Sequence, residues 1–145
     1  MAIAAFFALP FGTASAAPLC DGSEMGFAGL LAKCNQGEEL ELTLAAGVPL
    51  SDGPIVLQSG AYYEMMITSD GSQELALVGP EFFHAIWMDE IVINDLEVRP
   101  ISIDSFEFDD AGTIEFSFIA IKPGRYEMKI PGSTGESQRV DISIQ

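Results

Sequence analysis

Residues 113–126 read TIEFSFIAIKPGRY, and this stretch decides the fold of the chain. Its first part alternates around Ile114, Phe116 and Phe118, which is the period of a half-buried β-strand. The KPG that follows interrupts the alternation, which resumes over residues 124–130. The stretch therefore predicts two successive strands joined by a tight connection.

Similar short segments fill most of the chain from residue 38 onward, separated by turns rich in Gly, Pro, Asn and Asp. Asp70-Gly71, a dipeptide favoured in hairpins, separates two of them. The predicted fold class is all-β, a β-sandwich or barrel, because such sheets need a second apolar face to cover them. Strands are expected at 39–44, 55–58, 61–68, 73–78, 91–93, 96–99, 101–108, 113–121, 124–130 and 138–144.

One short helix is predicted within this pattern. Residues 80–90 read PEFFHAIWMDE, with Pro80 at the first helical position and Glu81 in the first turn. The aromatic residues Phe82, Phe83 and Trp87 are the first candidate for an interaction surface, because aromatic side chains dominate interface cores. The alternative is that these three rings fill one end of the sandwich.

Pro123, Gly124 and Tyr126 match the pattern of a tyrosine corner, in which the Tyr hydroxyl bonds to nearby backbone across a Greek-key crossing. Residues 58–145 resemble exported bacterial cupredoxin-like domains, because they combine an amphipathic strand, this corner and two further strands. The resemblance implies a Greek-key sandwich of cupredoxin-like type.

The blue-copper ligands of that family do not transfer with the fold. A type-one site needs two imidazoles, one thiolate and usually a weak thioether. The resemblance places these ligands at Gln73-Glu74-Leu75, at Lys129 or Ile130, and in the loop 131–137 (PGSTGES), none of which contains His, Cys or Met. With a single His in the chain, the sequence predicts no type-one copper centre and no resident cofactor.

Composition limits the partners. The chain has 145 residues, 22 acidic against 6 basic side chains and a net charge of -16, and 48% of its residues are apolar. One domain with a real core is expected, and the apolar fraction argues against a disordered acidic chain. Without a basic patch to neutralise phosphates, nucleic acid is excluded as a partner.

The N-terminus predicts export. An apolar run over residues 1–11 leads to Ala14-Ser15-Ala16, so residues 1–16 are interpreted as a signal peptide, leaving no stable membrane span after cleavage. In an exported chain, Cys20 and Cys34 predict one disulfide within an N-terminal segment, 17–37, that precedes the sandwich domain, 38–145. A lipid anchor at Cys20 and a buried N-terminal helix are the alternatives. The predicted location is periplasmic or secreted.

His84 is the one imidazole available for other chemistry. On a helix, His84 and Met88 would share a face, and with Met65 or Met66 they could form a non-blue Cu(I) site. The competing interpretation makes His84 a packed residue and the methionines core filling. Acidic groups, Glu107, Asp104 and Asp109-Asp110 or Asp89-Glu90 with Asp95, lack calcium-loop spacing and are interpreted as solvated turns and strand faces.

No nucleophile elbow, phosphate-binding loop or Cys–His pair is present, so the sequence predicts no enzyme. It predicts an exported cupredoxin-like binding domain without type-one copper, acting as an accessory to another envelope protein. The alternative is a periplasmic copper carrier using His84, Met88 and Met65.

Overall fold

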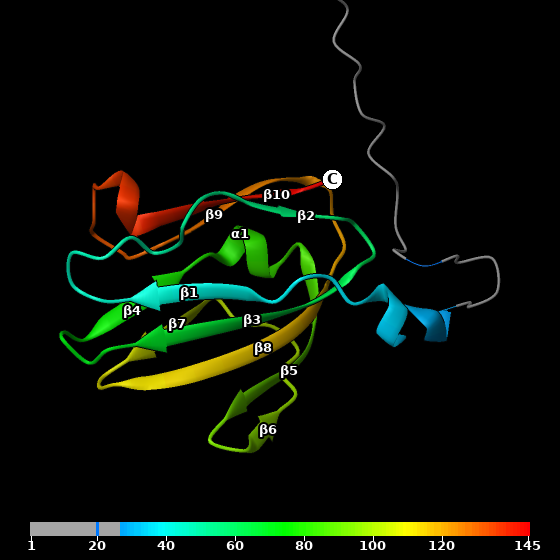
Figure 1. Ribbon diagram of the computed structural model, residues 1–145, viewed down its shortest axis with the longest axis horizontal. Helices are drawn as coiled ribbons and strands as arrows, with labels where there is room; N and C mark the ends of the chain where they lie inside the picture. Colours follow the sequence, from blue (N-terminus) through cyan, green and yellow to red (C-terminus); the bar gives the residue numbers. More distant parts are fainter. Residues whose placement is uncertain (1–19, 21–26) are drawn as a thin grey trace, which may run out of the picture.

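The computed structural model describes Cys20 and residues 27–145. In these residues, ten strands build two five-stranded sheets that face each other across an apolar core (Figure 1). The first sheet has the order β1-β3-β8-β5-β6, and the second has the order β2-β10-β9-β4-β7. The strand bounds are β1 Leu40–Leu44, β2 Ile55–Leu57, β3 Tyr62–Ser69, β4 Leu75–Val78, β5 Ile86–Ile93, β6 Leu96–Val98, β7 Ser105–Phe108, β8 Gly112–Ala120, β9 Gly124–Lys129 and β10 Arg139–Ile144.

Both sheets are open, so the fold is a sandwich and not a closed barrel. β1 pairs with β3 and β2 with β10 in parallel, while the remaining pairs are antiparallel. The turn at Asp70-Gly71 does not form a hairpin, because β3 and β4 belong to different sheets. Gly71 supplies a positive φ of 69° there, but the turn carries the chain across the sandwich.

The core is an aromatic stack between the sheets. Phe116 and Phe118 of β8 lie inward, with ring centroids 5.4 Å apart. The helix α1 (Pro80–Phe83) inserts Phe82 against Phe118 and Phe83 against Phe106 and Phe116. Figure 1 shows this helix between the two groups of strands. The helix therefore contributes to the core and does not cover its outside.

The predicted helix is real at its start but much shorter than expected. It ends at Phe83, and residues from Ile86 onward form β5. A β-bulge between Met88 and Glu90 adds one residue, so the inward side chains Met88 and Ile91 are three residues apart. The helix was predicted from Pro80 and Glu81, which mark where a helix starts and not where it ends.

Small 3-10 helices, η2 (Phe27–Leu31), η3 (Lys33–Asn35) and η4 (Glu136–Gln138), complete the described elements. No helix in the described ranges is long and apolar enough to cross a membrane.

Candidate functional site

The positions where blue-copper ligands were expected lie at one end of the second sheet. β4 runs antiparallel to β9, with Val78 opposite Lys129, so the start of β4 and the loop after β9 share that end. Lys129 forms an ion pair with Glu127 and, by this contact, lowers the pKa of the Glu127 carboxyl. The fold thus brings together the positions that the resemblance assigned to copper ligands, and Gln73-Glu74-Leu75, Lys129, Ile130 and the loop 131–137 contain no His, Cys or Met.

The tyrosine corner is present as predicted. Tyr126 lies near the start of β9, and its hydroxyl donates a 2.8 Å hydrogen bond to the carbonyl oxygen of Lys122. A Cβ on Gly124 would lie 2.7 Å from this hydroxyl oxygen, so the close approach requires glycine. The corner fixes the connection between β8 and β9 and has a structural role.

The structure separates the proposed copper ligands. His84 caps the end of α1 with its side chain 64% exposed, and its Nε2 lies 3.6 Å from Asp104 Oδ1. Met88 is on β5 and not on the helix, so the expected shared helix face with His84 does not exist. Met65 of β3 and Met88 are both buried in the core, where they fill space between the sheets.

The candidate aromatic surface is also divided. Phe82 and Phe83 are buried in the core and cannot contact a partner, which matches the alternative that they fill the sandwich. Trp87 of β5 is 47% exposed. It pairs across the strands with Ile119 of β8, which in turn pairs with Tyr62 of β3, so Trp87 lies on the outer face of the first sheet.

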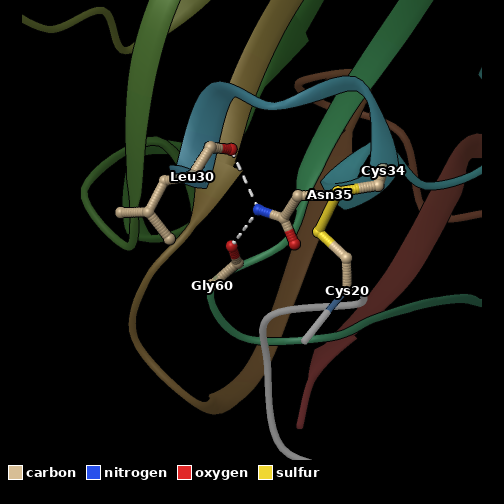
Figure 2. Close-up of a disulfide and its surroundings, with 5 residues drawn as sticks. All are labelled: Cys20, Leu30, Cys34, Asn35 and Gly60. Atoms are coloured by element: carbon tan, nitrogen blue, oxygen red, sulfur yellow. Dashed lines mark hydrogen bonds between the residues drawn. A yellow bond between two sulfur atoms is a disulfide. The ribbon is translucent and has the colours of Figure 1, made fainter. Parts of the chain in front are cut away.

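The predicted disulfide between Cys20 and Cys34 is confirmed, with Cα atoms 5.5 Å apart. Beside it, the buried Asn35 amide nitrogen donates hydrogen bonds of 2.9 Å to the Leu30 carbonyl and 2.8 Å to the Gly60 carbonyl (Figure 2). The bond to Leu30 lies within the N-terminal segment, and the bond to Gly60 ties that segment to the turn before β3. A disulfide is consistent with an extracytoplasmic location. The role of Asn35 was not predicted, since no local pattern marks a long-range amide contact.

Two acidic groups expected from the sequence differ in the structure. Glu107 and Asp109 lie with Glu74, and carboxylate oxygens of all three are within 4.8 Å of one another on an exposed surface. Asp89 and Glu90 instead contact Arg99, at 3.4 and 2.7 Å. The second group is therefore partly neutralised.

A groove of about 830 Å³ lies over the second sheet. Its charged side chains have both signs and include the ion pair between Lys129 and Glu127. A groove lined by side chains of both charges does not favour one charge class of ligand.

The outer face of the first sheet has a different character. Its five strands contain six acidic residues and no lysine or arginine, whereas the strands of the second sheet contain three of each sign. We call this surface the acidic face; its acidic residues are Glu41, Glu64, Asp89, Glu90, Glu97 and Glu115.

Crowding on the acidic face shows in two pKa values. Burial raises the pKa of the Glu64 carboxyl, and Glu115, Glu39 and Glu90 add to the effect while the Gln36 amide opposes it. Burial also raises the pKa of the Tyr62 phenol, and the negative charge of Asp89 contributes. Ionisation of these groups is therefore unfavourable, and a cation bound at the acidic face would make it less so.

No sequence-family profile matches the chain, and neither does any curated protein sequence. Solved structures do match in fold. A multicopper oxidase is 6% identical with a TM-score of 0.55, and it covers 74% of this chain. The multicopper oxidases of Pseudomonas thermotolerans and Pseudomonas parafulva are 13% and 14% identical, both with a TM-score of 0.53, and cover 75% and 74%.

This chain spans 44%, 30% and 30% of the lengths of those three proteins. At such low identities the comparison concerns the fold and not the activity. The two-sheet sandwich, the tyrosine corner and these structural neighbours agree. The chain has the cupredoxin-like fold of multicopper oxidase domains.

Proposed function

We propose that the chain is an exported cupredoxin-like binding domain that has no type-one copper site and acts by contacting another protein of the cell envelope. One observation carries the proposal. The positions that the resemblance to cupredoxins assigns to copper ligands share one end of the second sheet, and none of them has the His, Cys or Met side chain that a blue site needs. A domain that keeps the scaffold without the redox centre retains its surfaces as the means of action.

The acidic face with Trp87 is the surface that best supports a contact. Trp87 is large and half-exposed, and it lies in a cross-strand row with Ile119 and Tyr62 beside the acidic residues. An aromatic anchor within a polar surround is the usual composition of a protein interface. The proposed partner is another envelope protein, and the proposed compartment is the periplasm or the cell exterior.

A catalytic role has less support. The structural neighbours include oxidases, but this chain has one histidine in its whole sequence, and that histidine is exposed at the end of α1. The thioethers that would complete a Cu(I) site with it are in the core. We therefore propose a non-catalytic domain.

Site-specific photo-crosslinking tests the contact. A photoreactive phenylalanine analogue would replace Trp87 in one variant and Val56 in the matched control, because Val56 is 61% exposed on β2 of the other sheet. In the cells that make the protein, we expect one discrete adduct from position 87 and none from position 56. Adducts from neither position, or the same adducts from both, would contradict the proposed interface.

A further inference from the structure

We propose that the acidic face docks a lysine-bearing basic surface of the partner protein, and that one lysine ammonium group binds beside Ser117. This inference rests on the proposed function, since it names the chemistry of the partner at the same surface.

Charge asymmetry between the sheets is the first observation. The first sheet has acidic residues in every one of its five strands and basic residues in none. Arg99, just after β6, lies within 3.5 Å of carboxylates of Glu90 and Glu97. Glu41, Glu64 and Glu115 have no ion pair with any described residue, so this part of the face lacks a cation.

Ser117 supplies an independent observation. It is 4% exposed, and among the described residues its hydroxyl oxygen has no hydrogen-bond partner of standard geometry. In the cross-strand register, Ser117 stands between Glu64 of β3 and Glu90 of β5, on the same face. A buried hydroxyl without a well-formed hydrogen bond is unfavourable, and a ligand donor would recover part of that cost.

The groups around Ser117 suit an ammonium. Tyr62 Oη and Asp89 Oδ2 come from strands on either side of β8 and are 3.4 Å apart, a long contact for a hydrogen bond. Burial raises the pKa of the Tyr62 phenol and a side-chain contact with the Ser117 hydroxyl opposes that rise, so the two hydroxyls lie near each other. An ammonium has three donors and no acceptor, so it can bond carboxylate and hydroxyl oxygens together. The neighbouring aromatic side chains, Tyr62 and Trp87, favour a cation further.

The occupant is a lysine rather than nucleic acid or a divalent cation. Phosphate would be repelled by the face. The only described group of carboxylates close enough to hold a metal is Glu74, Glu107 and Asp109, outside this face. Trp87 adds apolar area that a lysine stem and its protein surroundings can cover.

The test uses the protein's single tryptophan, Trp87, as the reporter. A tetralysine peptide is titrated into the full chain while tryptophan fluorescence and calorimetry report binding. The same peptide with acetylated lysines is the charge control. We expect saturable binding of tetralysine that weakens with salt, and none of the acetylated form.

Two matched triple variants separate a site from general attraction to a net charge of -16. One is Glu41→Gln, Glu64→Gln and Glu115→Gln on the acidic face. The other is Glu74→Gln, Glu107→Gln and Asp109→Asn, which removes the same charge from another acidic cluster. We expect the first triple to weaken tetralysine binding at least tenfold and the second to change it less than twofold. Equal losses in both would overturn the proposal.

Ser117→Ala removes the hydroxyl and no charge. We expect about tenfold weaker tetralysine binding with undiminished thermal stability, because a hydrogen bond to a charged group is lost on binding while an unpartnered hydroxyl leaves the folded protein. Unchanged affinity would overturn the lysine assignment at Ser117. Spermidine binding as tightly as tetralysine would overturn a protein surface as the occupant. In either case a specific adduct at position 87 would leave the proposed binding function standing.

Discussion

Tyr126 shows how a single residue holds a connection in this fold. Its hydroxyl donates to the Lys122 carbonyl at 2.8 Å, and Gly124 leaves room for it. This contact was predictable because the local PGxY sequence carries the whole motif.

We expect Tyr126→Phe to lower the free energy of unfolding by about 1 kcal/mol, since one partly exposed hydrogen bond is lost and the ring remains. Denaturant unfolding measures the change. Tyr62→Phe is the control, because its 3.4 Å contact with Asp89 is long and should contribute less. A larger loss at Tyr62 than at Tyr126 would contradict this role of the corner.

Glu64 gives a pH-dependent prediction at the same scale. Because its pKa is raised in the folded protein above the ordinary 4.5, the folded state binds this proton more tightly than the unfolded state. Its favourable contribution is therefore complete below pH 4.5 and is lost as pH rises through the folded-state value. At neutral pH the ionised carboxylate opposes folding.

Glu64→Gln should consequently stabilise the protein slightly at neutral pH. We expect the free energy of unfolding to rise by no more than about 0.5 kcal/mol, with a small rise in melting temperature, because the side chain is half-buried at the surface. The Gln side chain can still accept the hydrogen bond from Gln36. Thermal melts above and below pH 4.5 measure the difference, with Glu74→Gln on the other sheet as control. A stabilisation that persists undiminished at acidic pH would contradict the explanation.

At the scale of elements, the disulfide and the bond from Asn35 to Leu30 hold the N-terminal segment together. Further hydrogen bonds from Asn35, Gln36 and Gly37 join it to Gly60 and to β3. The cysteine pair was predictable from number and context, but Asn35 was not. Its partner Gly60 is 25 residues away, and nothing in the local sequence marks that distance.

We expect the double variant Cys20→Ser, Cys34→Ser to lose about 3 kcal/mol of unfolding free energy, as the chain-entropy treatment gives for a loop of this size. Chemical denaturation of oxidised wild type and the double variant measures the loss. Wild type under reducing conditions should match the variant. A loss below about 1 kcal/mol would mean that the segment does not constrain the unfolded chain.

The elements also show where periodicity misleads. Strands β1, β3 and β8 were predicted to within about two residues, because each has one buried and one exposed face. β5 was not, since the helix-start signals at Pro80 and Glu81 were taken to extend over residues 86–90, which form the first part of β5. The expected strand 101–108 forms only from Ser105, because Pro100 precedes the segment and Ile101 has no sheet neighbour to pack on.

At the scale of the whole molecule, the acidic residues were interpreted from the sequence as solvated turns and strand faces, without a common location. The sheet order changes this interpretation, because strands scattered along the chain bring their acidic residues to one sheet. No linear pattern reveals this, since β1, β3, β8, β5 and β6 are neighbours only after folding. The aromatic surface predicted from adjacent residues was wrong at Phe82 and Phe83 for the same reason, and only Trp87 remains exposed.

We propose that this cupredoxin-like domain works without a type-one copper site. Titration of the purified, oxidised protein with Cu(II), followed by visible absorption and by metal analysis after dialysis, tests it most directly. We predict no blue thiolate-to-copper band and no stoichiometric copper after dialysis, because both cysteines form the disulfide and His84 is the single imidazole. One tightly retained copper per chain with an intense blue band would contradict the account.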